Sequence, residues 1–263
     1  MADLERVVPL SPGGTATPLF CVHAGSGSAY SYLGLARLLG ADRPVYGIEA
    51  PGFDNDRAPI RSVPALSAEY ADVLREFRPD GDFLLLGWSV GGSIAFDLAQ
   101  RLTAAGSRVR RLVLIDTSVP EVTPLPPEKE IARRFLSDLL AGLGAPLTAL
   151  DGIVDTTTGD TLLPAVERSA VLPSELDAEL LAERYAVFRA HVEASYGFEV
   201  TEAYHGPVVH VIASESPSHY MHWGKVATDL TEHFLPGTHH SIWAADNLPH
   251  LAGLIRNALA DAD

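Results

Sequence analysis

The chain has 263 residues, of which 47% are apolar, and a formal net charge of −15 at pH 7. This length allows one large α/β domain or two small ones, and the negative charge argues against nucleic acid or an anionic membrane as main partner. The single cysteine excludes an internal disulfide. Because the opening residues lack a basic segment followed by an apolar one, and no apolar run is long enough for a span, we expect a cytoplasmic protein.

Short apolar runs alternate with segments of helical spacing along most of the chain. The runs that predict strands are 18–24, 44–50, 82–87, 110–116 and 207–215, with a weaker one at 231–237. Their apolarity is continuous, which is typical of parallel strands covered on both faces. Apolar residues have helical spacing at 30–40, 65–77, 90–105 and 247–260. This alternation predicts a mostly parallel, doubly wound α/β sheet.

One long region, residues 119–204, contains no convincing strand. After a Pro-rich entry come helical patterns around 128–143 and 176–196, on either side of a connector rich in Thr, Asp and Gly at 150–160. Long insertions near active sites often serve as lids. We therefore expect a helical lid within a single domain of residues 1–263. The alternative is a second packed helical layer with no gating role.

A polar serine lies where a predicted strand meets a predicted helix, in the stretch Gly87-Trp88-Ser89-Val90-Gly91. The pattern G-x-S-x-G at such a junction is the nucleophile elbow, a strained turn that presents the serine hydroxyl at the carboxyl end of the sheet. Flanking glycines leave room for the tight turn. The N-terminus of the following helix favours a developing negative charge at the same place. Ser89 is therefore the predicted nucleophile.

A nucleophilic serine needs a base, and the base needs an acid that orients it. In folds with this elbow the order along the chain is Ser, then Asp or Glu, then His. Asp116 ends the strand after the elbow helix, and Glu215 follows the next strand, so both are candidate acids. The adjacent His239 and His240 precede the final helix and are the candidate bases. The other eight histidines are interpreted as surface or core residues.

Stabilising an oxyanion requires two backbone donors. The N–H of Val90, directly after the serine, is one candidate, and the loop Gly25-Ser26-Gly27 after the first strand supplies the other. This loop lacks the G-x-G-x-x-G spacing and the lysine of phosphate-binding loops. No group of His, Cys, Asp and Glu has metal-ligand spacing, so no metal site is expected.

Five segments of the predicted core carry a family resemblance when they are taken together. They are "PLFCVHAGSGSAYSYLGLARLL" (18–39), "PVYGIEAPGF" (44–53), "LLLGWSVGGSIAFDLAQRL" (84–102), "LVLIDTSVP" (112–120) and "LPGTHHSIW" (235–243). They resemble the thioesterase domains that end nonribosomal peptide synthetases and polyketide synthases. The resemblance implies an α/β-hydrolase fold with a helical lid, and it leaves 121–204 unmatched.

The resemblance also implies roles for individual residues. Ser89 would be the nucleophile, Asp116 the acid and His239 the base, since the family pattern G-x-H-x-S matches residues 237–241. The family's early motif H-P-x-G-G is replaced here by His-Ala-Gly-Ser-Gly. Gly25 is then our choice, with Val90, for the oxyanion hole. Trp223, near a tryptophan of the family, is interpreted as a packing residue.

A mechanism and its rivals follow from this resemblance. A carrier protein domain would deliver an acyl chain as a phosphopantetheine thioester, and an acyl-Ser89 intermediate would be released by hydrolysis or macrocyclisation. Phosphopantetheine belongs to the carrier, so no bound cofactor is expected. A carboxylesterase or lipase acting on free esters would use the same triad. Because the Ser, Asp and His set is complete, a non-catalytic binding protein is the less favoured hypothesis.

Overall fold

The computed structural model describes residues 4–145, 147–150, 152–153, 161–169, 171–217, 222–260 and 262. Within these residues, seven strands form one sheet in the order β1-β3-β2-β4-β5-β6-β7. The strands are β1 (Val7–Ser11), β2 (Leu19–Val22), β3 (Val45–Ile48), β4 (Phe83–Trp88), β5 (Val109–Ile115), β6 (Tyr204–Ala213) and β7 (Ala227–Leu235). Every neighbouring pair is parallel except β1 and β3. This arrangement confirms the predicted doubly wound sheet.

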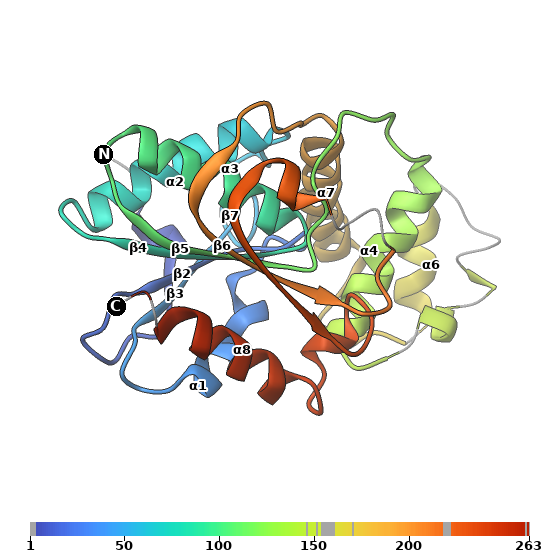
Figure 1. Cartoon of the computed structure of the whole chain (residues 1–263). Coiled ribbons are helices and arrows are strands. Elements are labelled where there is room, and N and C mark those ends of the chain that lie inside the picture. The colour runs from blue at the N-terminus through green and yellow to red at the C-terminus, as the bar shows by residue number, and fades with distance from the viewer. Residues whose placement is uncertain are drawn as a thin grey trace.

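Helices cover both faces of the sheet (Figure 1). α2 (Val63–Phe77) and α3 (Val90–Ala104) pack on one face, whereas α1 (Leu33–Leu39) and α8 (Leu248–Ala260) pack on the other. All six residues of β4 are buried, because this central strand has apolar neighbours on both sides. The continuous apolarity of the predicted strands reflects this two-sided burial.

Strand β1 is an element that the sequence analysis did not predict. It pairs antiparallel with β3 at the edge of the sheet, and its register shifts between Pro9 and Ser11. It is only partly buried, since Val7 and Leu10 are buried and Pro9 is exposed. A proline inside a short run argues against a central strand but is tolerated at an edge.

The region predicted as a lid carries three helices in its described residues. They are α4 (Glu128–Gly142), α6 (Leu162–Arg168) and α7 (Ala178–Tyr196), and they share an apolar cluster of their own. Phe135 of α4 packs against Tyr185 and Phe188 of α7. Of the predicted connector 150–160, all but three residues lie outside the described part of the chain. The gating role of this region remains a prediction.

α7 is tied to loops of the sheet at several points. Arg184 forms an ion pair with Asp54 and lies over the ring of Phe53, 3.8 Å from its centroid. Arg61, just before α2, forms an ion pair of 2.8 Å with Glu193. These contacts hold α7 against the carboxyl-end loops of the sheet, where it forms a wall beside the elbow. In the described part of the chain, every helix is too short or too polar to span a membrane.

Candidate active site

Ser89 lies in a tight turn between β4 and α3. Its backbone has φ +58° and ψ −132°, a strained conformation for a residue other than glycine. The turn closes only because the residues two positions before and after Ser89 are glycines, which have no side chain. A Cβ on Gly87 would lie 2.1 Å from the carbonyl oxygen of Gly91, and a Cβ on Gly91 would lie 2.3 Å from that of His23. Thr117 Oγ1 donates to the Ser89 carbonyl at 3.0 Å and helps to hold the turn.

Asp116 directly follows β5 and is 2% exposed. Its Oδ1 accepts from the Ala213 amide at 2.9 Å, and its Oδ2 accepts from Ser216 Oγ at 2.7 Å and from His239 Nδ1 at 2.6 Å. Burial alone would raise the pKa of this carboxyl, but the bonds from His239, Ser216 and Ala213 outweigh burial and hold the pKa below its ordinary value. Asp116 is therefore an ionised acceptor at neutral pH.

The alternative acid, Glu215, lies elsewhere. Glu215 is exposed on the loop after β6, and its backbone N–H donates to the carbonyl of Gly237 at 3.0 Å. Of the two candidate carboxylates, the structure brings Asp116 to His239.

The two adjacent histidines face different partners. His239 donates from Nδ1 to Asp116, so its Nε2 carries the lone pair in the neutral ring. The ring lies against Trp88 of the elbow, with centroids 5.0 Å apart and planes inclined by 31°. His240 Nε2 instead donates to Asp138 of α4 at 3.2 Å. One imidazole of the pair is therefore oriented by Asp116, and the other is directed to the lid region.

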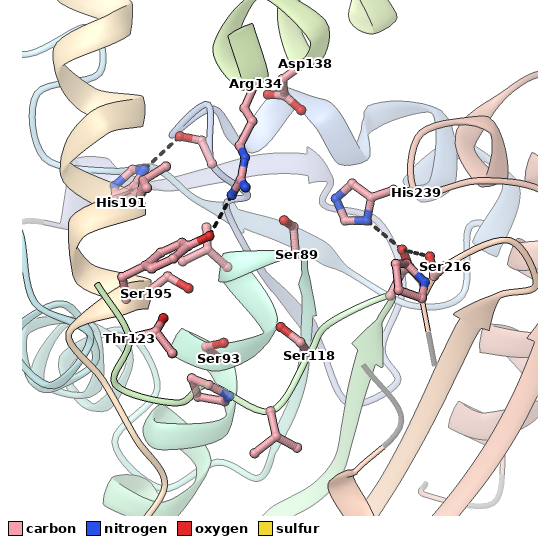
Figure 2. Close-up of a pocket in the computed structure, with 18 of the residues that line it drawn as sticks. Ser89, Ser93, Ser118, Thr123, Arg134, Asp138, His191, Ser195, Ser216 and His239 are labelled. Atoms are coloured by element: carbon pink, nitrogen blue, oxygen red, sulfur yellow. Dashed lines mark hydrogen bonds and ion pairs between the residues drawn. The ribbon is translucent and has the colours of Figure 1, made fainter. Parts of the chain in front are cut away.

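Ser89 and His239 line one cavity of about 720 Å³. Figure 2 shows both side chains at this cavity, together with Ser216, which donates to Asp116. Among the described residues, no hydrogen bond joins Ser89 Oγ to His239. Catalytic bonds of this kind often tighten only when substrate is bound.

The predicted oxyanion donors, Gly25 and Val90, also line this cavity. Val90 is the first residue of α3, where backbone N–H groups lack intrahelical acceptors. The Gly25 amide is oriented through the preceding peptide, because the Ala24 carbonyl accepts from His23 Nδ1 at 2.8 Å and from the Gly27 amide at 3.1 Å. In a trans peptide the N–H points opposite to the carbonyl. His23 therefore sets the direction of the Gly25 N–H.

A second buried histidine holds the same loop from α7. His191 Nδ1 donates to the Gly25 carbonyl at 2.9 Å, and its ring stacks on His23 with centroids 4.6 Å apart. Burial lowers the pKa of His191 to about 4; burial and then the neighbouring His191 hold that of His23 well below its ordinary value. Both rings are neutral at pH 7, with Nδ1 protonated. The sequence reading placed these two histidines among surface or core residues and missed their contact with the loop.

The remaining predicted features are structural. Trp223 is fully buried, and its indole N–H donates to the Thr117 carbonyl at 2.6 Å, which agrees with a packing role. Cys21 is buried in β2, and burial raises the pKa of its thiol. Within the described residues, no group of three or more His, Cys, Asp or Glu side chains could hold a metal ion.

Comparison with known proteins identifies the family that this chain matches. A family model described as "Thioesterase domain" matches residues 17–259. The thioesterase pytI of Aspergillus terreus is 33% identical over 226 residues, covering 77% of this chain and 71% of that protein. Malpibaldin synthetase of Mortierella alpina is 37% identical over 116 residues, covering 44% of this chain but only 2% of that protein.

Solved structures show the same fold. The four-domain nonribosomal peptide synthetase AB3403 matches with a TM-score of 0.83 and 26% identity, covering 96% of this chain and 20% of that one. The surfactin thioesterase domain SrfTE matches with a TM-score of 0.68 and 17% identity, covering 97% of this chain and 96% of that one.

Proposed function

The chain belongs to the thioesterase domain family, and on this premise we propose that it releases an acyl chain from a carrier-bound thioester through an acyl-Ser89 intermediate. The observation that carries the proposal is the hydrogen bond between Asp116 and His239 at the cavity that Ser89 lines. An oriented imidazole beside an elbow serine is the arrangement that acyl transfer needs.

The acylation step uses each of these groups once. His239 Nε2 takes the Ser89 proton as Oγ attacks the thioester carbonyl, and Asp116 stabilises the imidazolium that forms. The carbonyl oxygen becomes an oxyanion next to the amides of Val90 and Gly25, and such donors contribute several kcal/mol each. Collapse of the intermediate expels the thiol, which receives the proton from His239. The acyl chain is then an ester of Ser89.

Release reverses the roles of base and acid. His239 takes a proton from water, or from an amine or hydroxyl of the acyl chain, and that oxygen or nitrogen attacks the ester carbonyl. Water yields an acid, and an internal nucleophile yields a ring. The proton returns to Ser89, which restores the free enzyme.

The carrier partner is supported by the relatives. Several of them are named as peptide synthetases or polyketide synthases, among them a dimodular nonribosomal peptide synthase and the polyketide synthase PksR of Bacillus subtilis. We infer that an acyl or peptidyl carrier domain presents the chain on phosphopantetheine. The handle leaves with the carrier, so this scheme requires no resident cofactor.

The proposal is tested by comparing kcat/KM for one acyl group on three handles: a carrier domain, N-acetylcysteamine and p-nitrophenol. Contacts to the carrier and its arm help only if the enzyme has a site for them, so the carrier-linked thioester should be processed best. Intact mass spectrometry should show an acyl adduct that Ser89→Ala abolishes, with turnover lowered by a factor on the order of 10⁶. A best rate on the p-nitrophenyl ester, with no gain from the carrier, would favour a carboxylesterase instead.

A further inference from the structure

The loop that follows β2 lies directly against α7. A Cβ on Gly25 would lie 2.9 Å from the ring of Phe188. A Cβ on Gly27 would lie 2.8 Å from Val187 and 3.5 Å from His191. These three side chains of α7 are neighbours on one face of the helix, because they are three or four residues apart or adjacent. One face of α7 therefore packs on the loop that carries a predicted oxyanion donor.

Two hydrogen bonds fix the peptide groups on either side of Gly25. The Ala24 carbonyl accepts from His23 Nδ1 at 2.8 Å, and the Gly25 carbonyl accepts from His191 Nδ1 at 2.9 Å. Figure 2 draws the bond from His191 as a dashed line. Among the described residues, no other group donates a hydrogen bond to the Gly25 carbonyl. The orientation of the peptide after Gly25 therefore depends on a side chain of α7.

Gly25 needs this restraint because of its backbone freedom. Glycine has the least restricted φ and ψ of any residue, so a glycine loop does not hold the direction of its own N–H. A donor that stabilises a transition state must keep its place to within about 0.5 Å. With the carbonyls on both sides of Gly25 fixed, its two dihedrals are fixed as well. The bond from His191 supplies the second of these two restraints.

The surroundings of His191 indicate that this bond has a purpose beyond packing. The imidazole is fully buried in the middle of α7 and stacks on His23, with centroids 4.6 Å apart. Its other nitrogen, Nε2, is buried and has no hydrogen-bond partner among the described residues. A buried acceptor without a partner destabilises a fold, and a leucine at this position would avoid that penalty. The presence of histidine is explained if the bond from Nδ1 serves the reaction.

We propose that His191 is a positioning residue for the oxyanion hole: it fixes the Gly25 carbonyl from α7 and thereby holds the Gly25 N–H towards the oxygen of the tetrahedral intermediate. His191 acts through Gly25 and not on the reacting atoms. The inference rests on the proposed function only in taking Ser89 as nucleophile and Gly25 as oxyanion donor. Loss of the bond would weaken binding of the oxyanion and leave binding of the uncharged ground state largely unchanged.

The test compares a ligand that forms an oxyanion with one that cannot. When heptyl trifluoromethyl ketone binds, Ser89 Oγ bonds to the carbonyl carbon, the Ser89 proton passes to His239, and the carbonyl oxygen becomes an oxyanion. The alcohol obtained by reducing this ketone binds without forming the adduct. Inhibition constants of both are measured with p-nitrophenyl octanoate as substrate. Because this ester needs neither carrier nor thioester, failure of the thioesterase proposal on the three handles would leave this test intact.

Three substitutions at one position separate the bond from the packing. His191→Leu removes the donor at similar volume, so kcat should fall about 10- to 100-fold and the inhibition constant of the ketone should rise by the same factor. KM and the inhibition constant of the alcohol should change less than about threefold. His191→Asn should retain most of the activity, because its amide nitrogen can take the place of Nδ1. The amide of His191→Gln lies one bond further from the backbone, so this variant should resemble the leucine variant.

Leu181→Ala is the matched control for stability. Leu181 is fully buried on α7 within the apolar cluster of the three helices, so its truncation should lower the melting temperature. The ratio of the two inhibition constants should stay within about threefold of wild type. A parallel rise of both constants in His191→Leu would show that His191 only packs against the loop. If the leucine variant fails to fold, equal ratios in the asparagine and glutamine variants would overturn the inference.

Discussion

The carboxylate of Asp116 accepts three hydrogen bonds, and the one from His239 decides which imidazole nitrogen is free to act as a base. The bonds from Ser216 and Ala213 hold the carboxylate in place. Trp88 also helps to orient His239, because its indole packs against the imidazole ring. At the scale of single residues, the site is thus a set of fixed orientations around Ser89.

Replacing the acid tests this orientation directly. Asp116→Asn presents an amide N–H₂ group to His239 and favours the tautomer with the wrong nitrogen protonated, so kcat should fall by roughly 10⁴. Glu215→Gln is the matched control on an exposed carboxylate and should leave kcat within about twofold. Steady-state kinetics on one thioester measures both variants. The opposite ranking would move the acid to the loop after β6.

Alanine substitutions of His239 and His240 should have clearly different effects on activity. His239→Ala removes the imidazole that Asp116 orients, and kcat should fall by a factor on the order of 10⁶. His240→Ala removes the bond to Asp138 and the ring contacts with Trp88 and His239 but leaves the bond between His239 and Asp116, so a loss of no more than about tenfold is expected. Rates of acyl-enzyme formation, followed by mass spectrometry, distinguish the two. Normal acylation by the His239 variant would contradict the assignment.

The sequence predicted those site residues that belong to local motifs. Ser89 is recognisable from its elbow. The places after strands left Asp116 or Glu215 as the acid and His239 or His240 as the base, and the family resemblance selected Asp116 and His239. His191 was missed because it lies in the middle of α7, and nothing in its local pattern reveals a bond to Gly25. Such contacts depend on how a helix packs across the sheet. Sequence spacing within one element does not encode that packing.

At the scale of elements, the strand-turn-helix unit formed by β4 and α3 dominates the site. Its turn brings the backbone of α3 against the residues that follow β2, leaving no volume at Gly91. Side-chain identity matters less here than the absence of a Cβ. The unit therefore places Ser89 by close backbone contact.

A pair of alanine substitutions measures this contact. Gly91→Ala would put a Cβ 2.3 Å from the His23 carbonyl oxygen, so the free energy of unfolding should fall by about 3 kcal/mol and activity should drop about 100-fold. Gly253→Ala, inside α8, meets no atom within 4 Å and should raise stability by about 0.5–1 kcal/mol. Urea unfolding and kcat/KM are the measurements. Equal stabilities would contradict the close-approach argument.

Elements were predictable to different degrees. The six predicted strands all occur. Burial on both faces gives the central ones, such as β2 and β4, a continuous apolar run, whereas the edge strand β7 is largely exposed, which is why its signal in the sequence is weaker. β1 escaped detection since an edge strand with Pro9 lacks that signal. α6, a short helix of seven residues, was also not predicted. Its apolar residues pack only within the helical cluster, and a segment this short shows little periodicity.

At the scale of the whole molecule, buried histidines link stability to pH. His23, His191 and His210 are fully buried. Burial is the main cause that lowers their pKa values, to about 4 for both His191 and His210. An unfolded chain protonates histidine near pH 6.5. Between about pH 6.5 and 4 the unfolded state therefore binds more protons than the folded state.

Stability should accordingly be greatest above pH 6.5 and fall on acidification. Each of these histidines lowers the free energy of unfolding by up to about 1.4 kcal/mol per pH unit within that window. His191→Gln should reduce the slope by that amount in urea titrations between pH 7 and 5, whereas His250→Gln, at an exposed position, should not. A slope that His191→Gln leaves unchanged would show that His191 binds its proton equally in the folded and unfolded states, against the lowered pKa.

The order of strands across the sheet has a consequence for synthesis on the ribosome. Once β3 has settled between β1 and β2, β4 joins the free edge of β2, and β5, β6 and β7 then each join beside the strand before them. A nascent chain can therefore extend its sheet outward without reopening an existing pair, in keeping with N-terminal-first folding. Ser89 and Asp116 emerge in the first half of the chain, whereas His239 follows the last strand. An unfinished polypeptide thus carries its nucleophile with no base to activate it, and stays inert towards the reactive thioesters around it until the final loop has been translated.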